Sequence, residues 1–499
     1  MRKLISITFM LLCSCAVGLA QKAKEPYGID RYLNIRSSST PALSPDGKRV
    51  AFLTNITGTP QVWMIGSHGG WPEQMTFYED RVDFVTWSPD GAGLLFGKAR
   101  GGDENAQLYW MSPDGAQIKA LTADPKVRHN FGGWSHDGKW ISYASNKRDR
   151  NFFDVYVMEV ATGREELVYQ QDGSNDAVAW SFDNKKLIVS HDNEQLSLDN
   201  DLYLVDLTTK QATHLTPHEG AAQFGSVRFS PDGHSIFFGT NDKREFYSLA
   251  QMDLQSKRVD IIDNTEWDLE SIEMSPDGGL LAYTINRDGF SELFIRRLDT
   301  DGKPLITAIG AKEAPVKLPA KGLVSGLEFS RDMTGEGARD GNVLAFTFNS
   351  SRNPSDVWIY DLKSRQLQQV THSSLAGIPR SSFVEPELIR YKTFDGREIP
   401  AWYYKPNGPG QSVGLKPGQT VNLSVNLDQL LTAAQAREAA KYFTTEMTLK
   451  DEGLPVIINV HGGPEGQAQP SFSSIFQYFV SRGYAILAPN VRGSTGYGK

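Results

Sequence analysis

The residues in this sequence best suited to chemistry lie near its end, in a glycine-rich loop that follows an apolar run. The run is residues 456–460, and the loop begins with His461, Gly462, Gly463 and Pro464. Because glycine has no side chain, such a loop lets a substrate oxygen approach the backbone N–H groups, which stabilise negative charge developing on that oxygen. We therefore predict Gly462 and Gly463 as oxyanion-binding residues; the alternative is a Gly-Pro turn without chemistry.

Strand, helix and strand are predicted around this loop. Residues 456–460 and 484–488 are apolar runs, typical of strands buried on both faces, and Pro489 closes the second run. Between the two runs, apolar residues recur at helical spacing and predict a helix; they are Phe472, Ile475, Phe476, Phe479 and Val480. The order predicts one β-α-β unit of a parallel sheet. Since that sheet is incomplete, residues 484–488 are expected to form an unpaired edge strand.

A second motif follows the second strand, residues 490–498 with the sequence NVRGSTGYG. Together with HGGP after an apolar strand, it resembles the prolyl oligopeptidase family of serine peptidases, most closely the acylaminoacyl-peptidase-like branch. The resemblance implies that residues 379–499 are the N-terminal part of an α/β-hydrolase domain, whose loop after the third strand supplies one oxyanion-hole N–H. An alternating hairpin turning at Asp395-Gly396 resembles the first two strands of that domain. The insertion at residues 406–453 has helix-forming composition and receives no functional account.

A repeated turn signal fills the middle of the chain. Its typical form is an apolar residue followed by Ser-Pro-Asp-Gly, and its seven serines are Ser44, Ser88, Ser135, Ser181, Ser230, Ser275 and Ser330. Successive serines are 44 to 49 residues apart, except for a last step of 55. A spacing of 44 to 49 residues is the length of one four-stranded propeller blade. We therefore predict a seven-bladed β-propeller over residues 27–378. The aspartates of these turns are expected to cap their own turns rather than to act as acids.

A further copy of the signal, at Ser112, falls between two predicted blade starts. It is expected to be an ordinary hairpin turn within a blade.

A catalytic triad is absent from the printed sequence. A serine hydrolase of this fold needs Ser on a Gly-x-Ser-x-Gly turn, then Asp, then His. No such turn is present, and Gly493-Ser494 has Arg492 in place of the first glycine. We expect the Ser, Asp and His of the triad to follow Lys499, so that this chain is a fragment without activity. His461 precedes them and is expected to orient the oxyanion loop, with a purely structural role as the alternative.

Other chemistries lack their motifs. The nine histidines form no HExxH pattern, and there is neither a P-loop nor a dinucleotide fingerprint. We expect no metal and no cofactor. In the dipeptidyl-peptidase branch an acidic pair holds the substrate's amino terminus; Glu165-Glu166 is a candidate, but a solvated hairpin turn is the favoured interpretation.

The first twenty residues have the pattern of a bacterial signal peptide. Arg2 and Lys3 precede an apolar stretch, and a small-residue cleavage site precedes Gln21. A membrane anchor is the alternative, and Cys15 offers a loose match to a lipidation site. Both cysteines of the chain, Cys13 and Cys15, lie in this segment. The protein is expected to be exported, periplasmic or extracellular, with membrane attachment only if Cys15 is lipidated.

Composition and charge limit the partners. The chain is 39% hydrophobic and 22% charged, which is ordinary for a globular protein. Acidic residues outnumber basic ones, with a net charge of −8 that argues against nucleic acid. We expect an exported serine peptidase acting on short peptides, in which the propeller restricts access. The alternative is a non-catalytic periplasmic propeller that binds peptide or protein partners. Substrate preference and oligomeric state stay open.

Overall fold

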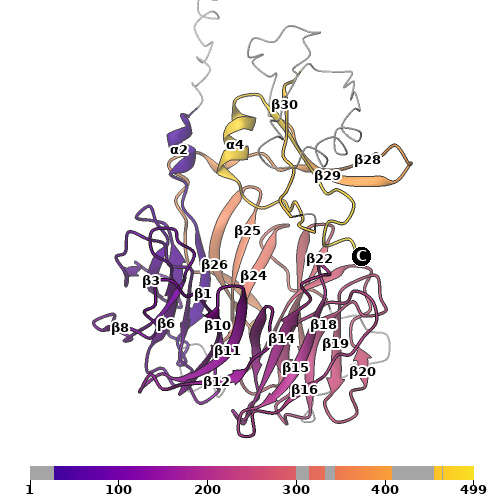
Figure 1. Cartoon of the computed structure of the whole chain (residues 1–499). Helices are drawn as coiled ribbons and strands as arrows, with labels where there is room; N and C mark the ends of the chain where they lie inside the picture. Colours follow the sequence, from indigo (N-terminus) through magenta and orange to yellow (C-terminus); the bar gives the residue numbers. More distant parts are fainter. Residues whose placement is uncertain (1–26, 299–313, 332–342, 407–453, 464) are drawn as a thin grey trace, which may run out of the picture.

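The chain folds into a ring of seven antiparallel sheets with a smaller mixed sheet above it (Figure 1). The structure, a computed structural model, describes residues 27–298, 314–331, 343–406, 454–463 and 465–499. The signal-peptide segment, Cys15, and nearly all of the insertion lie outside the described residues. The predicted fold class, a seven-bladed β-propeller followed by the beginning of an α/β-hydrolase domain, is confirmed.

Each propeller sheet uses consecutive strands of the chain, so the blades follow one another in sequence order. Six sheets have four described strands, and the sixth blade has three. Blades 1 to 3 comprise β1 (Ser38–Leu43), β2 (Arg49–Thr54), β3 (Gln61–Gly66) and β4 (Glu73–Gln74); β5 (Phe84–Trp87), β6 (Leu94–Lys98), β7 (Gln107–Met111) and β8 (Ile118–Ala120); and β9 (His129–Trp134), β10 (Trp140–Asp149), β11 (Phe152–Glu159) and β12 (Glu165–Tyr169). Blades 4 and 5 comprise β13 (Asn175–Trp180), β14 (Lys186–Asp192), β15 (Asn200–Asp206) and β16 (Ala212–His214); and β17 (Phe224–Phe229), β18 (Ser235–Thr240), β19 (Ser248–Asp253) and β20 (Val259–Ile261). Blades 6 and 7 comprise β21 (Asp268–Met274), β22 (Leu280–Arg287) and β23 (Phe290–Arg297); and β24 (Leu323–Phe329), β25 (Val343–Ser350), β26 (Asn353–Asp361) and β27 (Gln366–Gln369).

The repeated serine lies in the turn between the first and second strand of every blade and is buried. In blade 5 the Ser230 hydroxyl donates to Asp232 (2.5 Å), and its oxygen accepts the backbone N–H of Ser235 (2.9 Å). Five other blades repeat this pair of bonds; in blade 7, residue 332 is outside the described residues. The repeated signal is therefore a buried turn cap. Ser112 makes the same cap in the β7–β8 hairpin, as predicted.

Separate apolar cores join the blades pairwise around the ring. One buried cluster lies between each pair of neighbouring blades, including a cluster that joins the last blade to the first through Leu43, Phe52, Val343 and Val357. Because β1 packs directly on blade 7, the ring closes by side-chain packing rather than by a shared sheet.

The smaller sheet has the order β28-β29-β31-β30 and contains the predicted β-α-β unit. β30 and β31 are parallel, and β29 pairs with β31 on its other side. Its elements are η2 (Arg380–Ser382), β28 (Glu387–Lys392), β29 (Glu398–Tyr404), β30 (Val456–Ile458), α4 (Ser474–Ser481) and β31 (Ala485–Pro489).

Two sequence predictions about this sheet are wrong. β31, expected at the edge, is flanked by two strands, whereas β30 forms the edge among the described strands. β30 was expected to be buried on both faces, yet Ile458 is 52% exposed. An apolar run indicates strand character but not position in a sheet, because position depends on pairing with the distant β29.

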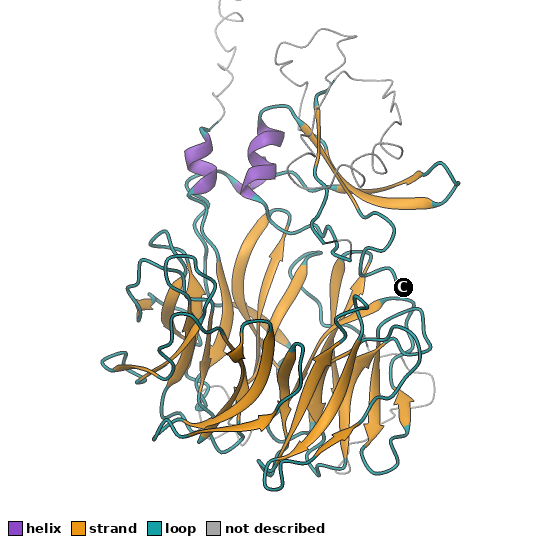
Figure 2. Cartoon of the chain, in the orientation of Figure 1, coloured by secondary structure: helices purple, strands orange, loops and turns teal. Residues whose placement is uncertain are grey.

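A short N-terminal helix, α2 (Ile29–Leu33), packs beside α4 above the ring (Figure 2). The rings of Tyr32 and Tyr478 meet edge to face at 5.5 Å, and Arg482 donates to the carbonyl of Tyr27 (3.1 Å). The chain therefore contacts the smaller sheet's helix before it enters the first blade. None of the described helices has the length and apolar character needed to cross a membrane.

Candidate functional site

The predicted oxyanion loop leaves the carboxyl end of β30 and turns at Gly463. Gly463 has φ +63°, in the left-handed region that favours glycine. An added Cβ at Gly462 or Gly463 would meet no atom within 4 Å, so open space lies in front of both residues. No described residue accepts a hydrogen bond from the Gly463 N–H. The exposed loop thus carries a backbone N–H without an acceptor among the described residues, and such an N–H is available to bind an oxyanion.

His461 anchors this loop to the second motif. Its Nε2 lies 2.9 Å from Ser494 Oγ, and the Ser494 hydroxyl donates to the carbonyl of Val491 (2.6 Å). Since the single hydroxyl hydrogen is already used, the histidine must donate from Nε2. Ser494 is only 4% exposed and is satisfied on both sides, which is unlike an activated nucleophile. The geometry supports a positioning role for His461.

Two further connections hold the loops after β30 and β31 together. Thr495 N–H donates to the Glu465 carbonyl (2.9 Å). The side chain of Asn490 makes a double contact with the backbone of Ala468: it accepts from its N–H (2.6 Å) and donates to its carbonyl (3.0 Å). The glycine loop and the NVRGSTGYG motif are therefore one hydrogen-bonded unit.

Asp268, the first residue of the innermost strand of blade 6, holds this unit from the propeller side. Its Oδ2 accepts the backbone N–H groups of Gly496 (2.9 Å) and Gly498 (3.4 Å), while its Oδ1 accepts that of Tyr247 (2.8 Å). Figure 1 shows the chain end above this part of the ring. Sequence reasoning missed Asp268, because nothing in the local pattern marks an aspartate at a strand start as a contact to residues more than two hundred positions away.

Blade 6 makes three more polar contacts with the smaller sheet and its loops. Asn286 donates to Gln467 (2.6 Å), and Gln469 donates to Glu270 (3.2 Å). Burial raises the pKa of Glu270, although its hydrogen bonds with Ser291 and Gln469 oppose this. Arg390 and Asp288 form an ion pair at 2.7 Å. Blade 6 thus contacts the segment that follows the glycine loop and strand β28 of the smaller sheet.

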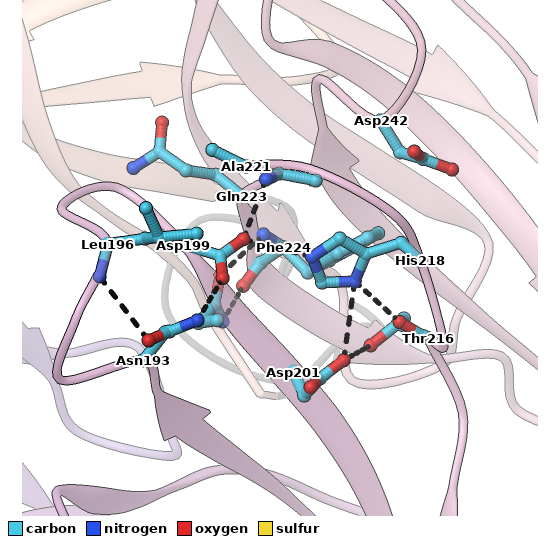
Figure 3. A network of polar contacts seen from close by, with 12 residues as sticks. Asn193, Leu196, Asp199, Asp201, Thr216, His218, Ala221, Gln223, Phe224 and Asp242 are labelled. Atoms are coloured by element: carbon cyan, nitrogen blue, oxygen red, sulfur yellow. Dashed lines mark hydrogen bonds and ion pairs between the residues drawn. The ribbon is translucent and has the colours of Figure 1, made fainter.

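A second contact to the chain end comes from the blade 4–blade 5 junction, where His218 lies among carboxylates (Figure 3). His218 Nε2 contacts Asp199 (2.9 Å), and Nδ1 contacts the Thr216 carbonyl (2.8 Å), with Asp201 at 3.4 Å. Burial lowers the pKa of His218, but the Thr216 carbonyl and the two carboxylates outweigh this and raise it.

This histidine cluster shapes the loop that touches the last residue. Asp199 accepts the backbone N–H of Ala222 (2.7 Å), and the neighbouring Ala221 carbonyl accepts from the Lys499 side chain (2.8 Å). Burial raises the pKa of Asp199, but the hydrogen bonds from Ala222 N–H, His218 and Asn193 lower it more. His218 is therefore charged more readily than an ordinary histidine, and it stabilises this loop.

The acidic pair considered from the sequence is engaged by basic and hydroxyl groups. Glu165 lies on β12 and accepts from Tyr143 (2.5 Å) and Lys147 (2.5 Å). Glu166 pairs with Lys210 (3.0 Å). The predicted solvated turn is therefore wrong in its place: both glutamates begin β12 after the hairpin, and their side chains serve structural contacts. Among the residues that the structure describes, no group of three or more His, Cys, Asp or Glu side chains could hold a metal ion.

The fold and this site define a class: a β-propeller joined to the first part of an α/β-hydrolase sheet, with the segments that follow the glycine loop and β31 in contact with the propeller. A family model for the TolB beta propeller domain matches residues 131–336. A solved structure, from a structural and mechanistic analysis of two prolyl endopeptidases, has a TM-score of 0.69 and 15% identity. The structural match covers 95% of this chain and 65% of the chain in the solved structure. At this similarity the match shows the fold.

Several sequence relatives are named as peptidases. Dipeptidyl aminopeptidase BIII of Pseudoxanthomonas mexicana is 24% identical over 92% of this chain and 59% of its own length. The uncharacterized peptidase YuxL of Bacillus subtilis is 24% identical over 93% of this chain and 70% of its length. A prolyl endopeptidase of Elizabethkingia miricola is 22% identical over 78% of this chain and 43% of its length.

These relatives and the fold support the resemblance of the chain to peptidases of the prolyl oligopeptidase family. The chain spans about 60% of the length of the dipeptidyl aminopeptidase and 70% of that of YuxL.

Proposed function

We propose that the protein containing this chain is a serine peptidase that hydrolyses short peptides by acyl transfer. The observation that carries the proposal is the exposed Gly463, whose N–H has no acceptor among the described residues, on a loop that His461 anchors. In this mechanism the N–H stabilises the oxyanion of the tetrahedral intermediate, together with the N–H of the residue after the nucleophile. The Ser, His and Asp of the triad belong to the part of the protein after Lys499.

The propeller is proposed to limit access to the site. The segment after the glycine loop and the NVRGSTGYG motif lie against blade 6, through Asn286 and Asp268. A folded protein cannot approach a loop that is covered from this side, whereas a short extended peptide can. The dipeptidyl and prolyl specificities named for the relatives belong to those proteins; the preference of this one is an open part of the proposal.

Export is also part of the proposal. It rests on the charge of Arg2 and Lys3, the apolar stretch and the cleavage pattern before Gln21. Mass spectrometry of the mature amino terminus in the native host tests it. Gln21 as first residue supports cleavage, and a lipid on Cys15 supports attachment to a membrane. An intact Met1 contradicts both.

The central experiment compares Gly463→Ala with Gly396→Ala in a protein that includes the sequence encoded after Lys499. Gly396 is a matched control, since it also has positive φ (+81°) and open space around an added Cβ. Both variants therefore carry the same conformational penalty. Misplacing one oxyanion donor is expected to lower kcat by about 10²–10³ on a chromogenic peptide, while Gly396→Ala retains wild-type kcat.

Two results would contradict the proposal. One is an unchanged kcat in Gly463→Ala, and the other is peptide hydrolysis by purified residues 1–499, which lack a nucleophile turn. A binding propeller is the second candidate, favoured by the match to the TolB propeller domain over residues 131–336. If the encoded sequence after Lys499 contains no Gly-x-Ser-x-Gly, Asp and His in this order, the binding role is supported instead.

A further inference from the structure

A cavity of about 360 Å³ occupies the propeller channel at the end away from the glycine loop. It is lined by the innermost strands of all seven blades and by the turns that follow them. The opposite ends of these strands face the smaller sheet, as Asp268 at the start of β21 shows. The cavity is therefore separate from the candidate peptidase site, and its volume falls in the range of small-molecule sites.

One side of the cavity is aromatic. Blades 3 and 4 contribute Phe131, Trp134, Trp180 and Phe182, with His136 stacked on Phe182 at a centroid distance of 4.3 Å. Burial lowers the pKa of His136, and the nearby Arg331 lowers it further, so this histidine is neutral at neutral pH. This side offers flat apolar faces for the body of a ligand.

The other side carries charged groups from blades 5, 6 and 7. Arg228 and Glu273 form an ion pair at 2.5 Å and neutralise one another. Glu328 accepts the backbone N–H of Leu43 (3.1 Å) across the seam between the last and first blades. Arg331, in the turn after β24, has no ion pair or hydrogen bond with any described residue.

Arg331 has no directly bound anion among the described side chains, although Glu328 and Glu273 lie near enough to raise its pKa against the effect of burial. Burial raises the pKa of Glu328 to about 8, against the opposing effects of the Leu43 N–H and Arg331. Glu328 is therefore protonated at neutral pH, and Glu273 is already paired with Arg228. A partly buried guanidinium without a directly bound anion is unfavourable, and a carboxylate is the group whose geometry matches it.

We propose that this cavity binds a small monocarboxylate with an aromatic or apolar body, its carboxylate on Arg331 and its body against the aromatic residues of blades 3 and 4. This site goes beyond the proposed peptidase function and does not depend on it. One negative charge balances Arg331, and the aromatic side sets the apolar character of the rest. The ligand's carboxylate replaces the partner that no described side chain provides.

Isothermal titration of the 499-residue chain with N-acetylphenylalanine at pH 7 tests the site, with N-acetylphenylalanine amide as the uncharged counterpart. The acid is expected to bind and the amide to bind at least about tenfold more weakly, since a charge-assisted pair is lost. Arg331→Gln should weaken binding of the acid by a similar factor. Arg258→Gln, at an arginine exposed on the outside of blade 5, should leave it unchanged.

The pH dependence separates this site from nonspecific binding. The charged or titratable described groups around Glu328 are Arg331, Glu273, Arg228 and His136. Above pH 8, Glu328 ionises and compensates Arg331, so affinity for the acid should fall. The Glu328→Gln variant keeps an acceptor for the Leu43 N–H, but the new side chain cannot ionise. This variant should therefore bind N-acetylphenylalanine at pH 9 as well as at pH 7.

Three outcomes would overturn the proposal. The first is no detectable binding of the acid at 10 mM, a concentration on the order of weak ligand affinities, and the second is equal binding of acid and amide. The third is full affinity for the acid in an Arg331→Gln variant whose melting curve matches that of the wild type. Loss of pH dependence in Glu328→Gln, together with loss of binding in Arg331→Gln, would establish it.

Discussion

At the scale of single residues, the seven buried serines do the same work in each blade. Each fills the turn after the innermost strand, where its oxygen accepts a backbone N–H that would otherwise be buried without a partner. The pKa of Asp46 lies below its usual value: burial would raise it, but the hydrogen bonds from Ser44 and Lys48 N–H lower it more. Asp46 is therefore an ionised turn cap rather than an acid.

Ser230→Ala should destabilise the protein, because it leaves the buried N–H of Ser235 without an acceptor. The expected loss is about 1–3 kcal/mol in the free energy of unfolding. Ser112→Ala removes the same cap from the exposed β7–β8 hairpin, where water replaces the lost bond, and should cost clearly less. Urea denaturation of both variants measures the difference; equal losses would show that burial does not set the value of this cap.

Residue types predicted the turns well because a Ser-Pro-Asp-Gly turn is specified within five neighbouring residues. The glycine turn at Gly463 was predictable for the same reason, while its role as an oxyanion site stays a prediction. Asp268, Glu328 and Arg331 could not be found this way, since their partners or neighbours in space come from other blades or from the smaller sheet. Local sequence specifies a turn, whereas a contact between distant segments depends on the completed ring.

At the scale of structural elements, the loops after β30 and β31 are held as one unit by contacts from both parts of the molecule. Asp268 binds two backbone N–H groups of the second loop, and His461 joins that loop to the first. The carboxylate is thus connected to the glycine loop through Ser494. The strand order in the smaller sheet was not predictable from apolar runs, since β29 enters between β28 and β31 by long-range pairing.

Asp268→Ala should loosen residues 490–499. Hydrogen bonds to a charged acceptor are worth more than neutral ones, so amide exchange in this segment should become roughly tenfold faster or more. Asp288→Ala breaks only the partly exposed ion pair with Arg390 and should change exchange little. Hydrogen–deuterium exchange read by mass spectrometry compares the two. If Asp268→Ala left the amides of residues 490–499 as protected from exchange as in the wild type, the proposed role of Asp268 in holding this segment would be disproved.

The His218 cluster predicts a pH dependence at the blade 4–blade 5 junction. Because the pKa of His218 is raised in the folded protein, its stabilising effect is complete below the ordinary histidine pKa and is lost as pH rises through the raised value. His218→Gln should therefore lower the melting temperature more at pH 6 than at pH 9. His234→Gln, at an exposed histidine in the same propeller, should show no such difference. A penalty for His218→Gln that is equal at both pH values would exclude a charged His218.

At the scale of the whole molecule, the propeller has its own hydrophobic core. Its seven inter-blade clusters contain residues of the blades and their connecting loops only, and the smaller sheet has a separate cluster around Trp402, Tyr404 and Ile486. Contacts between the two parts are polar at Asp268 and Asn286 and aromatic where Phe290 of blade 6 meets Trp402 at a centroid distance of 5.2 Å. Such an interface holds the parts in register without being the main source of the propeller's stability.

Residues 36–378 are therefore expected to fold without the rest of the chain. They include every blade and omit α2, which packs on α4 rather than on a blade. The far-ultraviolet circular dichroism spectrum should be β-rich, and thermal unfolding should be cooperative. Residues 36–322, which omit blade 7, are the matched control: they leave Leu43 and Phe52 of blade 1 without their packing partners and open the ring. This shorter protein should lose the cooperative transition or aggregate through its exposed blade faces. If both proteins melt alike, closure between the last and first blades does not stabilise the ring; if neither folds, the propeller depends on the smaller sheet for its stability.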